Sequence, residues 1–172
     1  MARKKVNESV VETLRTIPLF QSICEREEML QALAEKMEEK VVKPGTYLIK
    51  EGQMGESMYI LREGEVEVSK STIENTPYTV AAMRGQDNAF FGELALLDKD
   101  RRSASIHAVT RCELLKLGRK GFEEFGDQYP DGALQIMREL AKIVCRRFRA
   151  TNRDVVRLFS ALVNEISQRE ID

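Results

Sequence analysis

The sequence predicts an α+β fold, mainly β, in which an antiparallel β-roll of jelly-roll type is flanked by N-terminal helices and by a long C-terminal helix. Three observations carry this prediction. Apolar residues recur at helical spacing in residues 1–40, short alternating runs separated by glycine fill residues 41–118, and helical spacing returns over residues 119–172. We therefore expect one domain made of these three segments.

Two helices are expected before the roll. An apolar stripe predicts the first helix, which ends near Pro18. The second is predicted to start at Ser22, an N-cap with Glu25 at the spacing of a capping box, and to run to about Glu39. The apolar residues that support these helices are Val10, Val11, Leu14, Met29, Leu30, Leu33, Ala34 and Met37.

Residues 41–118 have the pattern of an antiparallel sheet. Pro44 and Gly45 fit the central positions of a type II turn, and further glycines separate short apolar runs. Many short strands with turns at close intervals predict a sandwich or barrel. The expected strands are residues 47–49, 58–61, 66–68, 78–80, 105–109 and 112–117.

The C-terminal segment is predicted to be helical. A short helix covers residues 119–128, and Asp131 caps a long helix that reaches about Ile166. At 1.5 Å per residue this helix is about 50 Å long, longer than a roll of this size needs, and Thr151-Asn152 is the expected kink. Its apolar stripe is long enough for a parallel helix pair, so we expect a homodimer through this helix.

One face of the long helix is basic. One interpretation is that the basic stripe binds an acidic partner, a membrane or nucleic acid. The second is that it is a solvated face or pairs with acidic neighbours such as Glu35, Glu38 and Glu39. The second interpretation is favoured here. Residues 141–160 contain six basic residues and one acid, Asp154; the basic residues, called the stripe here, are Lys142, Arg146, Arg147, Arg149, Arg153 and Arg157.

Composition excludes several function classes. The formal net charge is −1, which removes the bulk electrostatic argument for DNA binding. Only one histidine, His107, is present, and it is expected at the surface of a strand rather than on a metal. The three cysteines, Cys24, Cys112 and Cys145, do not have the spacing of metal ligands, and we expect them at core positions. Their odd number without pairing fits a reducing compartment. With no apolar run of about 18 residues or signal peptide, a cytoplasmic protein without a membrane span is expected.

One motif differs from the sequence pattern of strands and turns around it. Gly92 permits close backbone approach to a ligand, and residues 93–97 form one helical turn whose unpaired N–H groups suit an anion. Glu93 provides an acceptor for sugar hydroxyls, and Arg102 provides a guanidinium fork for phosphate. Together these groups fit a phosphorylated sugar. From the residues alone, a buried amphipathic turn remains the alternative.

The motif also resembles that of a known family. Residues 91–97 followed by residues 102–106 resemble the phosphate-binding cassette of cyclic-nucleotide-binding domains, the domain of catabolite activators and of the regulatory subunits of cAMP-dependent protein kinase. The resemblance extends over roughly residues 15–148, through Lys43-Pro44-Gly45 and the stretch Glu51–Glu56. A slightly long approach, residues 84–89, departs from the pattern before the cassette.

The resemblance implies a role for each cassette residue. Glu93 would accept a hydrogen bond from the ribose 2′-hydroxyl, and Arg102 would pair with the cyclic phosphate. Ser103 occupies a position where serine accompanies cAMP and threonine tends to accompany cGMP, so cAMP is the expected ligand rather than cGMP. The backbone contacts to ribose and phosphate would come from Gly92, Leu94, Ala95 and Ala104.

The expected function is ligand sensing without catalysis and without a metal. The nucleotide would draw the C-terminal helix down as a lid, and the moved helix would signal to an unidentified protein effector. No catalytic constellation is visible. Two alternatives stay open: a ligand-independent structural or interaction module on the same fold, and the sensor part of a transcription regulator that lacks its DNA-binding domain.

Overall fold

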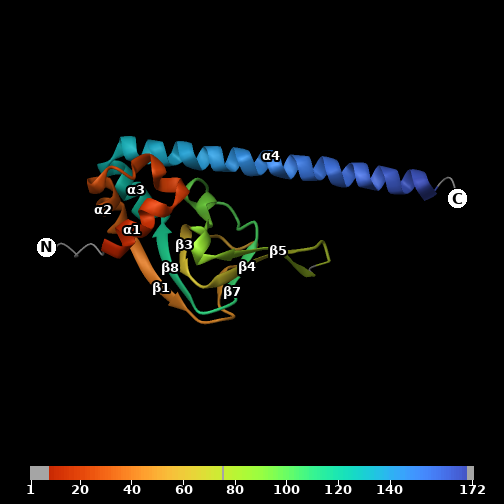
Figure 1. Cartoon of the computed structure of the whole chain (residues 1–172), viewed down its shortest axis with the longest axis horizontal. Coiled ribbons are helices and arrows are strands. Elements are labelled where there is room, and N and C mark those ends of the chain that lie inside the picture. The colour runs from red at the N-terminus through yellow and green to blue at the C-terminus, as the bar shows by residue number, and fades with distance from the viewer. Residues whose placement is uncertain (1–7, 75, 170–172) are drawn as a thin grey trace. The chain divides into compact units, whose positions relative to one another are not determined.

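The computed structural model describes residues 8–74 and 76–169, so the ends of the predicted N- and C-terminal segments lie outside the described residues. Two compact units are present, one through Ile136 and one from Met137. The first holds three short helices, a β-roll, the short helix that follows its last strand and the first turns of the long C-terminal helix (Figure 1). The predicted roll, its flanking helices and the long C-terminal helix are confirmed.

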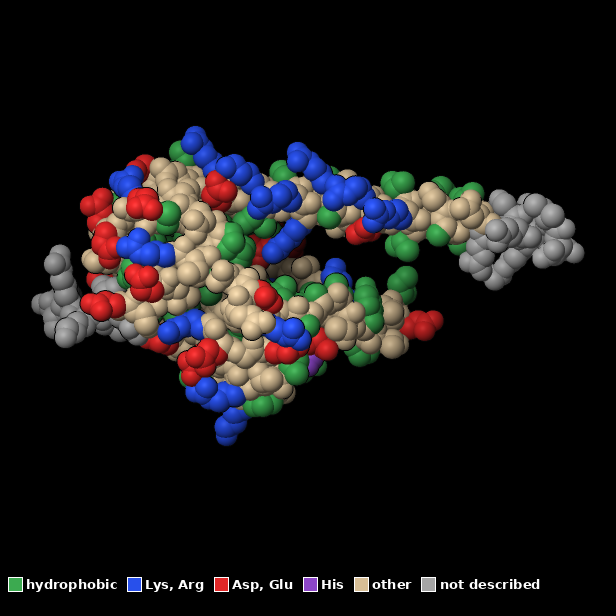
Figure 2. Space-filling model, viewed as in Figure 1, with side chains coloured by type: hydrophobic (Ala, Val, Ile, Leu, Met, Phe, Trp, Pro, Cys, Tyr) green, Lys and Arg blue, Asp and Glu red, His purple; other side chains and the backbone are tan. Residues whose placement is uncertain are grey.

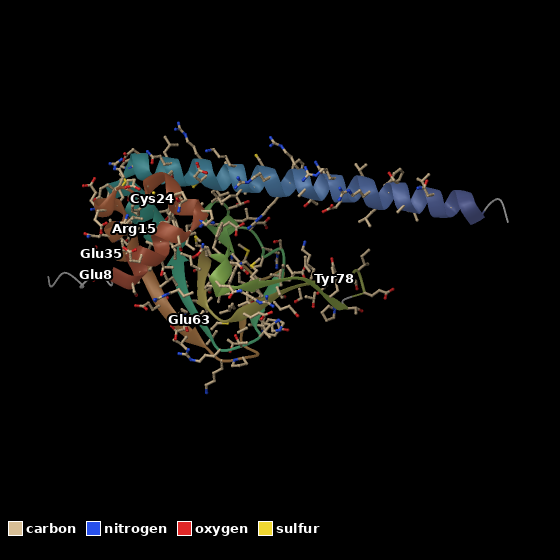
Figure 3. All side chains as sticks on the ribbon, in the orientation of Figure 1. Glu8, Arg15, Cys24, Glu35, Glu63 and Tyr78 are labelled. Atoms are coloured by element: carbon tan, nitrogen blue, oxygen red, sulfur yellow. The ribbon has the colours of Figure 1, made fainter. Side chains whose placement is uncertain are left out.

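Three helices precede the roll, and their apolar sides are buried. Leu14, Phe20 and Ile23 are fully buried there. The Arg15 guanidinium donates a hydrogen bond to the backbone carbonyl of Cys24, which ties the first helix to the segment that follows it (Figure 3). The helices are α1 (Glu8–Thr16), the 3-10 helix η1 (Pro18–Ile23) and α2 (Glu27–Ala34).

The predicted second helix was wrong at both ends. Ser22 lies inside η1, because Pro18 starts a 3-10 helix that incorporates it, and the residue before α2 is Arg26, which makes no side-chain cap. Met37 and Glu39 belong to a strand rather than to the helix. Met37 is buried in the strand, and it also falls at the helical spacing of the preceding apolar residues. Its apolar character therefore does not distinguish a strand from a helix.

The roll consists of two four-stranded sheets with antiparallel pairing throughout. The strand order is β1-β8-β3-β6 in one sheet and β2-β7-β4-β5 in the other. β1 and the short β6 were not among the predicted strands. The strands are β1 (Met37–Val42), β2 (Tyr47–Ile49), β3 (Ser57–Glu63), β4 (Glu65–Ser71), β5 (Pro77–Arg84), β6 (Phe90–Phe91), β7 (Ser105–Ala108) and β8 (Cys112–Gly118).

The core lies between the two sheets and follows the two-residue alternation of the strands. Val66 pairs with Ala108, and Val68 pairs with Ile106, so inward-facing side chains of neighbouring strands meet at the same level. Burial of each large apolar side chain stabilises the fold by about 1.5–3 kcal/mol. The core cluster contains Ile49, Leu61, Val66, Val68, Phe91, Ile106, Ala108, Cys112 and Leu114.

Two helices follow the roll. α3 (Arg119–Gln128) has the predicted bounds, and α4 (Pro130–Arg169) begins one residue before the predicted cap. Asp131 lies in the first turn of α4, where it accepts a hydrogen bond of 2.8 Å from Nη1 of Arg26. Helical structure continues through residues 151 and 152, so the expected kink does not interrupt α4.

Candidate functional site

The predicted cassette lies between β6 and β7 and begins with a glycine in the left-handed region. Gly92 has a φ of 73° and precedes the 3-10 helix η3 (Glu93–Leu96). A Cβ at this position would lie 2.9 Å from Nη1 of Arg102 and 3.1 Å from the carbonyl oxygen of Ser57. Both the backbone angle and the close approach of Arg102 therefore require glycine here.

The turn of η3 buries one side and exposes the other. Ala95 and Leu96 pack inward, whereas Leu94 is 45% exposed. The amide of Ala95 donates a 3.1 Å hydrogen bond to the carbonyl of Gly92. This amide is therefore used inside the turn, and its predicted contact to a ligand, like that of Leu94, stays a prediction.

Glu93 is the only buried charged residue in the described part of the chain, with 2% of its surface exposed. An ionised carboxylate in such a place is costly unless charges or hydrogen-bond donors compensate it. Arg102 is one source of compensation, because the two groups attract each other electrostatically. The structure therefore confines a carboxylate and a guanidinium to the same corner of the roll.

Arg102 is half-buried and held by backbone oxygens. Its Nη1 donates to the carbonyl of Gly92 at 3.1 Å, and its Nη2 donates to the carbonyl of Ser57 at 2.6 Å. Burial lowers the pKa of Arg102 from its ordinary value, while the electrostatic effects of Tyr59 and Glu93 raise it. The guanidinium remains charged at neutral pH, partly withdrawn from water and close to the start of η3.

The backbone of Arg102 is fixed by the loop between β2 and β3. The Gly52 amide donates to the Arg102 carbonyl at 2.9 Å, and the Arg102 amide donates to the Gln53 carbonyl at 2.9 Å. Arg101 adds a hydrogen bond of 2.8 Å from its Nη1 to the Gly52 carbonyl, and it forms an isolated bridge with Met54. This loop, residues 50–56, thus clamps both arginines in place.

The remaining cassette residues lie along the approach to β7. Ser103 is exposed, and Ala104 is partly buried against the core cluster of the roll. The hydroxyl of Ser105 accepts a 3.0 Å hydrogen bond from the Glu51 amide, which ties this stretch to the same loop. The predicted ligand contacts of Ser103 and Ala104 stay predictions.

Sequence reasoning missed the residues that hold the arginine from the other side. Ser57 supplies the second carbonyl acceptor, and Gly55 lies directly against the guanidinium. The stretch containing Gly55 was part of the family resemblance, but no local signal links it to a residue 47 positions further on. The spacing of Gly52 and Gly55, two glycines in one short loop, was the only hint.

The other candidate residues take different positions. Cys112 is buried in the core as predicted, but Cys24 is partly exposed and Cys145 is exposed, and all three thiols are free. His107 is half-buried rather than on the surface, between the Tyr47 ring and Glu67. Among the described residues, no group of three or more His, Cys, Asp and Glu is placed to hold a metal ion. None of the described helices combines the length and apolar character needed to cross a membrane.

Two of the three acidic residues considered for the arginine stripe form ion pairs within the first unit. Glu38 pairs with Lys40 and Lys116, and Glu39 pairs with Arg62. Lys and Arg side chains line the visible face of α4, and acidic side chains gather over the N-terminal helices (Figure 2).

Comparison with known proteins places the chain in the same family by sequence and by fold. The sequence profile of the cyclic nucleotide-binding domain matches residues 39–129, more than half of the chain. The human potassium/sodium hyperpolarization-activated cyclic nucleotide-gated channel 1 is 35% identical over 126 residues, which are 73% of this chain and 13% of the channel. The chain belongs to the cyclic nucleotide-binding domain family.

Solved structures agree. The catabolite activator protein of Thermus thermophilus has a TM-score of 0.70 and 27% identity, with coverage of 82% of this chain and 62% of that one. The regulatory domain of protein kinase A from Toxoplasma gondii, crystallised with cAMP, has a TM-score of 0.62 and 36% identity, with coverage of 69% and 43%. The fold is therefore shared by proteins that differ in their remaining parts.

Proposed function

We propose that this chain is a cyclic-nucleotide sensor that binds cAMP at the corner formed by Gly92, Glu93 and Arg102. The observation that carries the proposal is the placement of a buried carboxylate and a half-buried guanidinium on either side of one glycine turn. A structural turn has no need of two opposite charges withdrawn from water, since burying them is costly. A ligand with both a phosphate and a free ribose hydroxyl uses both.

The proposed chemistry assigns one part of the ligand to each charge. Arg102 now donates to two neutral carbonyls, and a phosphate oxygen is a stronger acceptor because a charge-assisted hydrogen bond is roughly twice as strong as a neutral one. Glu93 would accept from the ribose 2′-hydroxyl. The burial of Glu93 and the partial burial of Arg102 strengthen these interactions relative to the same contacts in water.

The preference for cAMP rests on Ser103 and on the relatives. Serine follows the phosphate arginine here, and the residue is exposed, so its hydroxyl is accessible to a ligand. The Toxoplasma relative, with 36% identity, was solved with cAMP. Both observations support cAMP over cGMP.

We further propose that the C-terminal helix moves as a lid when the ligand binds. The moved helix transmits the signal to a protein effector. The same helix pairs with a second copy of the chain. A broad exposed apolar face on this helix supports pairing, because an apolar face of this size is costly in water. Its exposed residues are Phe148, Val155, Val156, Leu158, Phe159, Leu162, Val163 and Ile166. We propose a regulatory, non-catalytic role in the cytoplasm and no direct DNA contact.

Thermal unfolding with and without nucleotide tests the proposal. At 100 times its dissociation constant, a ligand adds about 2.7 kcal/mol to the free energy of unfolding. We expect cAMP to raise the midpoint at a lower concentration than cGMP, and 5′-AMP, which lacks the cyclic phosphate, to have a much smaller effect. An unchanged midpoint in millimolar cAMP and cGMP would favour the ligand-independent interaction module instead.

Movement of the helix is tested separately with Cys145. Because Cys145 is exposed and Cys112 is buried, a thiol reagent reports on the helix and on the roll core in one reaction. We expect cAMP to change the labelling rate of Cys145 and to leave Cys112 protected, with Cys24 replaced by serine to remove its signal. Identical Cys145 rates with and without saturating cAMP would contradict the lid.

A further inference from the structure

Gly55 lies against the guanidinium of Arg102, although the two residues are far apart in the sequence. A Cβ at Gly55 would come within 2.5 Å of both Cζ and Nη2 of Arg102, and it would overlap Nε as well. Real Cβ atoms essentially never approach other atoms so closely. The guanidinium therefore occupies the space that any side chain at position 55 would need.

The backbone at Gly55 does not itself demand glycine. The glycines with positive φ in the described chain are Gly45, Gly52, Gly64 and Gly92, and Gly55 is not among them. An alanine at position 55 would have an ordinary backbone conformation, so the cost of this substitution comes from the contact with Arg102. Gly92 differs from Gly55, because both its positive φ and its contact with Arg102 disfavour a side chain at that position.

The position of the guanidinium decides which acceptors it reaches. Gly55 lies two residues before Ser57, whose carbonyl accepts the 2.6 Å hydrogen bond from Nη2, and on the opposite side Nη1 reaches the Gly92 carbonyl at 3.1 Å. A shift large enough to relieve the overlap breaks at least the Ser57 hydrogen bond, because that bond uses Nη2, one of the three Arg102 atoms that the new Cβ would overlap.

We propose that Gly55 is a positioning residue for phosphate binding: the side chain it lacks leaves the space in which the Arg102 guanidinium is held facing the start of η3. The inference rests on the proposed function, because it matters only if Arg102 binds the phosphate. Gly55 touches no ligand in this account. It acts solely through Arg102, which makes it separable from a general structural role.

A matched control substitution is available at Gly118, the last residue of β8. Gly118 has an ordinary φ of −78°, and a Cβ there would lie 4.0 Å from the Ser57 hydroxyl, an ordinary van der Waals distance. Gly118→Ala therefore changes the same residue type near the same strand without displacing Arg102. We expect it to leave cAMP affinity and the thermal midpoint unchanged.

The test is a double-mutant cycle on cAMP affinity, measured by calorimetric titration of wild type, Gly55→Ala, Arg102→Ala and the double variant, with Gly118→Ala as control. Displacement of the guanidinium from the start of η3 predicts at least a tenfold weaker affinity for Gly55→Ala, since each hydrogen bond from this charged group to the phosphate contributes about 1.5–3 kcal/mol. In the Arg102→Ala background, where the space is vacant, Gly55→Ala should have no further effect.

The thermal midpoints of the ligand-free variants complete the cycle. If Gly55→Ala lowers the midpoint, removal of the Arg102 side chain should restore it, and this rescue would support the proposal. A double variant that is as destabilised as Gly55→Ala, or that loses further affinity relative to Arg102→Ala, would overturn it. So would unchanged affinity in Gly55→Ala while wild type binds cAMP. Wild type that binds neither cAMP nor cGMP would contradict the proposed function itself, and with it this inference.

Discussion

The guanidinium of Arg102 donates a 2.6 Å hydrogen bond to the backbone carbonyl of Ser57, the first residue of β3. Ser57 in turn pairs with Gly118 at the end of β8, and the next residue, Arg119, donates its amide to the Glu56 carbonyl at 2.7 Å. The cassette arginine is thus connected through one strand end to the first residue of α3. A ligand that draws Arg102 away from Ser57 would act directly on this connection.

Ser103→Thr is expected to shift the nucleotide preference toward cGMP. Threonine adds a methyl group and fixes the hydroxyl at a position where, in the family that the sequence resembles, it accompanies cGMP binding. We expect the ratio of cGMP to cAMP affinity to rise several-fold, which corresponds to the contribution of one hydrogen bond, about 1 kcal/mol. Competition titrations with both nucleotides measure this ratio. Ser103→Ala, which lacks the hydroxyl, is the control and should not raise cGMP affinity.

Glu93→Gln is expected to weaken cAMP binding by about tenfold, since the charge-assisted acceptor for the ribose hydroxyl becomes neutral. The reason can be isolated with 2′-deoxy-cAMP, which lacks that hydroxyl. Wild type should discriminate between the two nucleotides, and the variant should discriminate much less. Equal discrimination by both proteins would show that Glu93 does not contact the 2′-hydroxyl.

The apolar face of the C-terminal helix is expected to hold a dimer together. Val155 and Leu162 are exposed and seven residues apart, so they lie on one face. Replacing both with glutamate should give a monomer at concentrations where wild type sediments as a dimer. Ser160→Glu with Asn164→Glu places the same charges on the opposite face and should leave the dimer intact. A monomeric wild type would contradict the dimer.

Acid should weaken the contact between α2 and the start of α4. The hydrogen bond from Arg26 holds the pKa of Asp131 below its ordinary value of 3.8. A carboxyl group with a lowered pKa in the folded state stabilises the fold above its ordinary pKa, and this contribution is lost as pH falls through the folded value. Both side chains are exposed, so the effect is small.

Urea unfolding of wild type and Asp131→Asn measures this effect. Wild type should be the more stable protein at pH 7, and the difference should shrink below pH 4 or so, as the carboxylate is protonated. Asp127→Asn, an exposed carboxylate of α3 that forms no ion pair in the described part of the chain, should show no such trend. A difference that grows toward acid would contradict this account of the Arg26 contact.

The sequence could group the cassette residues into one candidate site because they are local. Gly92 and Glu93 adjoin, and Arg102 follows within ten residues, so a single motif carries all three. The contacts of Arg102 with Gly55 and Ser57 could not be predicted in this way. They depend on the pairing of β3 with β8 and on the loop before β3, and the register of strands distant in sequence is not a local property.

The errors in the helical region have a similar cause. Ser22 and Glu25 satisfy a capping pattern, but Pro18 had already committed the chain to a 3-10 helix that includes Ser22. Met37 continues the helical spacing of Leu33, yet its pairing with Leu117 in the sheet places it in β1. A competing local signal overrides the short pattern in the first case, and tertiary pairing overrides it in the second.

The central claim is that Arg102 binds the phosphate of a cyclic nucleotide, and calorimetric titration of cAMP into wild type and Arg102→Ala tests it most directly. Arg111→Ala, an exposed arginine paired with Glu113 away from the cassette, is the control. We predict saturable binding to wild type and to the control, and about 100-fold weaker binding to Arg102→Ala, the loss expected when charge-assisted hydrogen bonds to phosphate are removed. Equal affinity of wild type and Arg102→Ala for cAMP would contradict it.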